Sequence, residues 1–245
     1  LHACLPAGYT YPMQAVILTA GRWTRMEELT TAVPKSMLTV DGKTLLEYKL
    51  EALPDEIEEI ILVVGHLSHV IKTHYGSKYR GRPLIHVEQT ELNGTAGALW
   101  SAKDFIKDRF LVLNGDDILF ATDLKRCVEG SDTWKLLVQQ TDEMYRAGSV
   151  ELDENANITA IIEGDRGTAQ GLASTNIFTL DTRLFSQPLI PKQEGSLEFG
   201  LPQTVIAAAK SIGVVLEPIF TKDWIQINAP GDLVKASAIL KKMKK

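Results

Sequence analysis

The sequence predicts an α/β fold, in which a mixed, mostly parallel sheet carries helices on both faces and a small β-rich lid follows. Two observations predict this class. Short apolar runs alternate with amphipathic segments through the first half of the chain, and that alternation is typical of a parallel sheet covered by helices. The second half changes to a hairpin with a polar turn and separate apolar segments, which we interpret as a lid built from the distal part of the chain.

Five apolar runs are expected to be buried strands. Each is short and almost entirely apolar, as strands are when helices cover both faces of their sheet. The runs are residues 15–18, 60–64, 84–87, 110–113 and 136–138.

Two helices are expected between these runs. One covers residues 45–53 and ends before Pro54, because proline cannot continue a helix. The other covers residues 96–106 and is preceded by Asn93-Gly94-Thr95, a typical helix start.

The second half begins with a hairpin, in which residues 148–152 pair with residues 158–162 across a polar turn. Further strands are expected at residues 176–180, 214–220 and 224–227, and helices at residues 202–210 and from about residue 230. We interpret residues 1–12 as an irregular arm and residues 13–245 as a single domain, with residues 13–140 and 141–245 as its halves.

Composition limits the class of protein. The 245 residues are 44% hydrophobic, with 26 basic and 31 acidic side chains and a formal net charge of −5, which excludes a protein that wraps nucleic acid. The longest apolar runs are far shorter than the ~20 residues of a membrane helix, and two cysteines suit a reducing compartment. We expect a soluble, cytoplasmic protein with no membrane or nucleic-acid partner, and a homo-oligomer is left open.

A loop with the composition of a phosphate-binding site follows the first strand. Gly21 lets backbone amides approach an anion, and Arg25 and Lys35 supply charge-assisted hydrogen bonds to phosphate oxygens. The same features also fit an ordinary polar loop with surface cations. The loop residues alone leave both interpretations open.

Three segments in this order resemble the sugar nucleotidyltransferases, or nucleoside-diphosphate-sugar pyrophosphorylases. The opening residues 15–38, the pair of Gln89 with residues 94–98, and the strand end at residues 113–117 match that family's signatures, and matches extend to residue 232. The resemblance implies a Rossmann-like α/β fold and a sugar-binding role for the lid.

The resemblance also implies roles for residues on the nucleotide side. Arg25 and Lys35 would contact the phosphates and, together with Asp116, would be the catalytic residues. The implied nucleotide-binding residues are Leu18, Ala20, Gly21, Thr24, Gln89, Gly94 and Thr95.

Magnesium is the implied cofactor, and Asp116 its ligand. A strand that ends in Gly115-Asp116 places a carboxylate at the carboxyl edge of the sheet, where open α/β folds bind ligands, and Mg²⁺ prefers oxygen donors. Asp117 is expected to point elsewhere, because successive strand residues face opposite sides. Gln226 stands where the family has a second metal-binding aspartate, and Asn228 is an alternative amide ligand.

On the sugar side, the resemblance assigns Gly148, Glu163 and Thr175 to the acceptor. Gly164 stands where the family commonly has a lysine, so sugar recognition is expected to differ from that of familiar members. Trp23 replaces a second glycine of the phosphate loop, and a bulky residue there is costly if the backbone needs a positive φ.

The implied activity joins a nucleoside triphosphate (UTP, dTTP or GTP) to a sugar 1-phosphate. The sugar phosphate would attack the α-phosphorus in line, with Mg²⁺ assisting, to give a nucleoside-diphosphate sugar and pyrophosphate without a covalent enzyme intermediate. Glucose 1-phosphate with UTP or dTTP is the preferred pair. Two alternatives remain: a regulatory paralogue with little or no turnover, and transfer to a non-sugar phosphate such as phosphocholine.

Overall fold

A computed structural model describes residues 12–21, 27–130, 133–142, 144, 147–164 and 170–243. The strands of its large sheet are β1 (Met13–Leu18), β4 (Ile57–Val64), β5 (Lys78–Tyr79), β6 (Arg82–Glu88), β7 (Phe110–Asn114), β8 (Trp134–Thr141), β9 (Ser149–Leu152), β10 (Ile158–Ile162), β11 (Gly171–Leu180) and β12 (Leu216–Thr221). A separate small hairpin consists of β2 (Thr39–Val40) and β3 (Lys43–Thr44).

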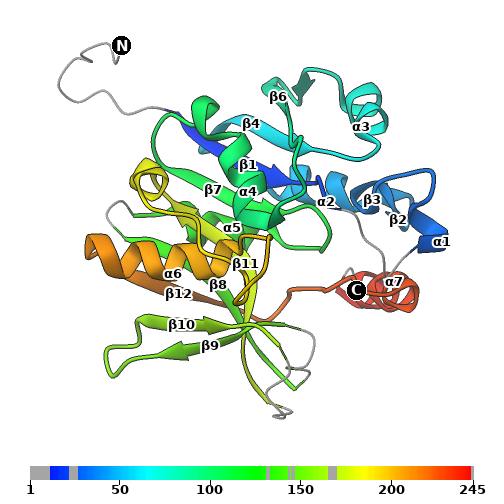
Figure 1. Ribbon diagram of the computed structural model, residues 1–245. Helices are drawn as coiled ribbons and strands as arrows, with labels where there is room; N and C mark the ends of the chain where they lie inside the picture. The colour runs from blue at the N-terminus through cyan, green and yellow to red at the C-terminus, as the bar shows by residue number, and fades with distance from the viewer. Residues whose placement is uncertain are drawn as a thin grey trace.

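Helices flank this sheet (Figure 1). The α-helices are α1 (Glu27–Thr30), α2 (Leu45–Ala52), α3 (Ser68–Tyr75), α4 (Gly94–Ser101), α5 (Ala121–Val128), α6 (Leu201–Ile212) and α7 (Pro230–Met243). The 3₁₀ turns are η2 (Lys35–Met37), η3 (Lys103–Phe105) and η5 (Thr182–Ser186).

The sheet has ten strands, in the order β10-β9-β11-β7-β1-β4-β6-β5, with β8 beside β11 and β12 beside β8. Strands β7, β1, β4 and β6 are parallel to one another, whereas β11 runs antiparallel to β7 and β8. The predicted α/β class with a mixed sheet is therefore confirmed, and one continuous sheet contains strands from both predicted halves.

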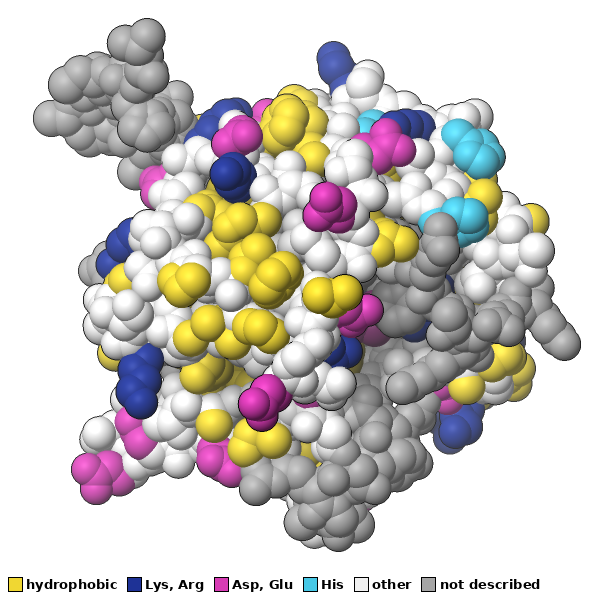
Figure 2. Space-filling model, viewed as in Figure 1, with side chains coloured by type: hydrophobic (Ala, Val, Ile, Leu, Met, Phe, Trp, Pro, Cys, Tyr) yellow, Lys and Arg dark blue, Asp and Glu magenta, His cyan; other side chains and the backbone are white. Residues whose placement is uncertain are grey.

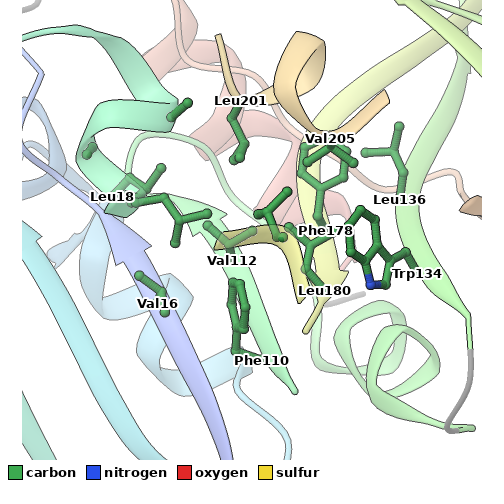
Figure 3. Packing of buried hydrophobic residues seen from close by; sticks show 14 of the residues in the cluster. Val16, Leu18, Phe110, Val112, Trp134, Leu136, Phe178, Leu180, Leu201 and Val205 are labelled. Carbon is green, nitrogen blue, oxygen red and sulfur yellow. The ribbon is translucent and has the colours of Figure 1, made fainter. Parts of the chain in front are cut away.

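Side chains of the central strands alternate between two cores. Val16 and Leu18 lie in a cluster with residues of α4 and α6, some of which Figure 3 shows. Ala15 and Ile17 lie in a second cluster, with residues of α2, α3 and α5. Both faces of the sheet are thus covered by helices, which explains why β1 is apolar at every position from 15 to 18.

A third, smaller core lies beside the sheet. Ile225 and Ile227 pack there against Val40 of the small hairpin and against Ala236 and Leu240 of α7. Residues 224–227 are apolar because of this packing, and the prediction of a strand there is wrong, since they make only a single bridge, between Ile225 and Ile118.

Strand β11 changes neighbour along its length. Residues Phe178–Leu180 pair with β7, whereas Ala173 pairs with Ser149 of β9. The register with β8 shifts between Ser174 and Phe178, and Asn176 within that bulge has a φ of 58°. The bulge turns β11 away from the end of β7.

The remaining differences from the sequence-based elements are local. The helix expected at residues 96–106 ends at Ser101 and is followed by η3, and the strand expected from residue 176 starts at Gly171. Helices α3 and α5 were not among the expected helices. Most of the expected irregular arm, residues 1–11, lies outside the described residues.

The outer face over α4 and α6 carries a group of hydrophobic side chains (Figure 2). Trp100, Phe185, Phe199 and Ile206 are only partly buried there. None of the helices in the described ranges has the length and apolar composition that crossing a membrane requires.

Candidate active site

The candidate site lies at the carboxyl ends of the parallel strands. The amide of Gly115 donates to the carbonyl of Leu18 at 3.0 Å, and the amide of Gln89 donates to the carbonyl of Val64 at 2.8 Å. A Cβ on Gly115 would lie 2.6 Å from Cγ2 of Thr19, so glycine is needed for β7 to end this close to β1. This edge is where ligands bind in open α/β folds.

Two adjoining cavities open at this edge. The lid cavity, of 540 Å³, lies toward the lid strands, and the helix cavity, of 550 Å³, lies toward α4 and α6. Both are lined by Asn114, Glu163, Asn176 and Lys192. The two cavities therefore meet where β7 ends and where the bulge of β11 turns away from it.

The structure brings most of the predicted site residues to these cavities. The lid cavity is lined by Asp116, Gly148, Glu163, Thr175 and Gln226. The helix cavity is lined by Leu18, Ala20, Gly21, Gln89, Gly94 and Thr95. Thr24, Arg25 and Trp23 lie outside the described residues, so their predicted roles stay predictions.

Lys35 lies behind Asp116. Its Nζ donates to Oδ2 of Asp116 at 2.7 Å, and its side chain is 1% exposed against 13% for that of Asp116. The carboxylate of Asp116 thus reaches the lid cavity with a buried cation beside it.

Asp117 makes separate contacts from those of its neighbour Asp116, as the sequence predicts. Its two carboxylate oxygens accept hydrogen bonds from the buried ammonium of Lys49 and from Nε1 of Trp224. Burial raises the pKa of Asp117, although the Lys49 charge acts to lower it. This carboxylate is therefore tied into the protein rather than free to serve a ligand.

Oxygen donors that suit Mg²⁺ gather in the lid cavity. Asp116 supplies a carboxylate, and Gln226 and Asn228 line the same cavity with amide oxygens. In the part of the chain that the structure describes, no cluster of three or more His, Cys, Asp and Glu side chains is placed to hold a metal. The residues fit an ion that keeps several waters and shares its coordination with substrate phosphates, as Mg²⁺ does.

The helix cavity is shaped by contacts between the start of α4 and the segment before α6. The amide of Phe199 donates to the carbonyl of Asn93 at 2.7 Å, and the amide of Leu201 donates to Oγ1 of Thr95 at 3.0 Å. Gln89 is 6% exposed, and its Nε2 donates to Oδ1 of Asn93 and to the carbonyl of Gly94. Both contacts use the amide nitrogen of Gln89, which lines the helix cavity.

Gly94 meets two requirements that only glycine satisfies. Its φ is +94°, and a Cβ there would lie 2.4 Å from the carbonyl oxygen of Phe199. We expect Gly94→Ala to lower the free energy of unfolding by about 2 kcal/mol or more, measured by urea denaturation. Gly213→Ala is the control, because Gly213 has a φ of +69° but open space around it, and it should cost only about 1 kcal/mol. Equal losses in the two variants would contradict the close approach.

Thr175 lines the lid cavity, but its hydroxyl is committed to the protein. Its Oγ1 donates to the carbonyl of Leu137 at 2.7 Å, and the side chain is 1% exposed. Its neighbour Asn176, at the bulge of β11, lines both cavities and is only partly buried. Asn176 is thus better placed than Thr175 to contact a ligand with its side chain.

Lys192 is the functional candidate that the sequence analysis missed. Among the described residues that line the two cavities, it is the only one with a positive charge. Its Nζ lies 3.6 Å from Oε2 of Glu163, and its side chain is 50% exposed. No local motif marks Lys192, because it reaches the cavities from a loop that folds back through the bridge of Pro191 with Phe199.

Comparisons with known proteins agree with this geometry. Residues 14–242 match the model of the nucleotidyl transferase family. The chain is 31% identical over 227 residues to a UTP–glucose-1-phosphate uridylyltransferase of Haloferax volcanii, covering 90% of this chain and 93% of that protein.

Two further relatives show the extent of the match. The bifunctional protein GlmU of Methanococcus aeolicus is 30% identical over 236 residues, which cover 95% of this chain but 56% of that protein, so the chain spans about half of its length. The solved structure of an inositol-1-phosphate CTP transferase from T. maritima aligns with a TM-score of 0.75 at 22% identity, covering 97% of this chain and 98% of that one. This last likeness concerns the fold.

Proposed function

The chain belongs to the nucleotidyl transferase family, among its sugar-1-phosphate nucleotidyltransferases, and we propose that it joins UTP to glucose 1-phosphate with release of pyrophosphate. The observation that carries this proposal is the pair of adjoining cavities, which share Asn114, Glu163, Asn176 and Lys192, with Asp116 in the lining of the lid cavity. A transfer between two phosphorylated substrates needs two pockets whose phosphate ends meet. The uridylyltransferase relative supports UTP and glucose 1-phosphate as the first pair to test.

In this proposal the nucleotide occupies the helix cavity. The amide oxygen of Gln89 and the backbone near Gly94 and Thr95 face the base, while Gly21 lets the loop approach the phosphates. Arg25 would neutralise charge on the leaving pyrophosphate. Lys35 stabilises the α-phosphoryl group through its position beside Asp116.

The sugar 1-phosphate occupies the lid cavity. An oxygen of its phosphate attacks the α-phosphorus of the nucleotide, and the bond from that phosphorus to the pyrophosphate breaks, so that pyrophosphate leaves with the electron pair. Glu163 accepts hydrogen bonds from sugar hydroxyls, and Gly148 offers its backbone. When bound by Asp116, with Gln226 or Asn228 as a further oxygen donor, Mg²⁺ supplies charge neutralisation at the phosphate oxygens.

The test is pyrophosphate release with Mg²⁺ across a grid of nucleoside triphosphates and phosphorylated acceptors. The acceptors include glucose 1-phosphate, other sugar 1-phosphates and phosphocholine, with a control that lacks acceptor. Release that depends on UTP and a sugar 1-phosphate is the expected result. An empty grid, from protein that binds UTP in calorimetry, would favour a regulatory paralogue, and release with phosphocholine alone would favour a non-sugar acceptor.

Lys192 gives a second prediction for this function. As the only described cation lining both cavities, it is placed to hold the phosphate of the sugar, and Lys192→Ala should raise the KM for glucose 1-phosphate about tenfold with little change in the KM for UTP. Lys210→Ala, which removes an exposed lysine of α6, is the control and should change neither. An unchanged KM for glucose 1-phosphate in Lys192→Ala would refute this role.

A further inference from the structure

We infer that Lys49 is a positioning residue for this reaction: with Asp117 and Trp224 it forms a buried clamp that fixes Asp116 and Gln226 relative to each other. The inference rests on the proposed function. Asp117 and Trp224 line the lid cavity, whereas Lys49 lines neither cavity and acts through them. The clamp is defined as Lys49, Asp117 and Trp224.

The ion pair at the centre of the clamp is unusually buried. The Lys49 side chain, near the middle of α2, is 0% exposed, and that of Asp117 is 8% exposed. Burying two charges costs desolvation that their attraction only partly offsets, so a pair of apolar side chains would stabilise the fold as well or better. A role in geometry explains why charges are kept here.

The clamp joins the two segments that carry the proposed metal ligands. Asp117 accepts a hydrogen bond from the indole of Trp224. One residue further along each segment, Ile118 and Ile225 exchange two backbone hydrogen bonds of 3.0 and 3.1 Å. The backbone amide of Trp224 is held in addition by Oε1 of Gln139 at 2.9 Å.

These contacts set the position of the neighbouring ligands. Asp116 directly precedes Asp117, and Gln226 directly follows Ile225, so each proposed ligand is one residue away from a fixed contact. Asp116 is further tied to Lys35. Lys35 of η2 and Lys49 of α2 thereby hold the consecutive carboxylates of Asp116 and Asp117 through separate ion pairs.

Removing the Lys49 charge should disturb this arrangement and also destabilise the fold, because the buried Asp117 carboxylate is left without its cation. The Asp117 carboxylate would lose its buried cation, and any shift that lets it reach water would displace Asp116 or Trp224. A displacement of about 1 Å at reacting groups lowers rates about 10²-fold.

The test compares Lys49→Met with Lys43→Met. Lys43 forms an exposed ion pair with Glu51 of the same helix α2, so its loss is a matched control. We expect Lys49→Met to lower kcat about 10²-fold, to change the KM for UTP less than threefold, and to weaken Mn²⁺ binding to the chain, measured by electron paramagnetic resonance without substrates. Lys43→Met should leave all three quantities unchanged.

The double variant Lys49→Met/Asp117→Asn separates positioning from a merely structural role. It contains neither buried charge, so it should regain thermal stability lost by Lys49→Met while kcat and Mn²⁺ binding stay low. It also serves as the test if Lys49→Met does not fold. Full kcat and Mn²⁺ binding in folded Lys49→Met, or recovery of both in the double variant, would overturn the inference.

Failure of the proposed function would look different from failure of this inference. A wild-type chain without activity on any acceptor would contradict the proposed function. An active wild-type chain whose Lys49→Met variant turns over at the same rate would contradict only the inference about the clamp. The Mn²⁺ measurement reports on the clamp in either case.

Discussion

Asp116→Asn is expected to lower kcat for pyrophosphate release by about 10³-fold or more while the chain stays folded. The carboxylates of three described residues, Asp116, Asp117 and Glu163, line the lid cavity. Asp117 is paired with Lys49 and Glu163 belongs to the lid, whereas Oδ2 of Asp116 lies 2.7 Å from Nζ of Lys35. Asparagine keeps its shape but lacks the charge that pairs with Lys35 and that, in the proposed function, would hold Mg²⁺. Loss of one such electrostatic group costs about 10²–10³ in kcat in comparable sites, and loss of the metal adds to it.

The measurement is steady-state pyrophosphate release at saturating Mg²⁺, with circular dichroism and thermal unfolding to check the fold. Asp104→Asn, at an exposed aspartate of η3, is the control and should keep wild-type activity. The assignment of Asp116 is wrong if Asp116→Asn keeps more than about a tenth of the wild-type kcat, because the loss of an essential charge lowers kcat by more than that.

Lys35→Met is expected to have the second largest effect, a loss of about 10²-fold or more in kcat. Its ammonium is buried beside the Asp116 carboxylate, so its removal takes away the partner of that carboxylate and the charge proposed to stabilise the α-phosphoryl group. Lys72→Met is the control, because Lys72 forms an exposed ion pair with Glu88 and neither residue lines a cavity.

A double variant sharpens this prediction. If Lys35 and Asp116 act as one unit, Lys35→Met/Asp116→Asn should be little worse than Asp116→Asn alone, because effects of residues in one network are not additive. Fully multiplicative losses in kcat would show that the two side chains act separately, and wild-type kcat in Lys35→Met would remove Lys35 from the mechanism.

The part of the fold that the sequence predicts well is the parallel core. In β1 every residue from 15 to 18 is apolar because helices cover both of its faces, and such a run is a clear strand signal. The carboxyl ends of these strands then place Gly21 and Asp116 at one edge, which follows from parallel topology alone.

Other features depend on contacts that no local pattern records. Residues 224–227 have the apolarity of a strand, but they owe it to the third core and α7. The bulge at Asn176 allows β11 to change neighbour, although its sequence continues as an ordinary strand. Tertiary packing decides such cases over local propensity.

The site residues divide in the same way. Gln89, Gly94 and Asp116 stand in short motifs whose resemblance to the nucleotidyltransferase family predicts their place, and the three residues line the cavities. Lys192 lies in a loop and contacts Glu163, and Lys49 lies on a buried face of α2 and contacts Asp117. Their sequence context is that of a surface cation and of a lysine in an amphipathic helix, so only the folded chain reveals them.

The most direct test of the central claim follows the oxygen atoms of the acceptor. Glucose 1-phosphate with oxygen-18 in its non-ester phosphate oxygens would be incubated with UTP, Mg²⁺ and the chain, and both products weighed by mass spectrometry. Attack of the sugar phosphate on the α-phosphorus predicts that all of the label stays in the nucleoside-diphosphate sugar and none enters pyrophosphate. Label in the pyrophosphate would contradict the account. Release of pyrophosphate with no labelled nucleoside-diphosphate sugar as the second product would also contradict it.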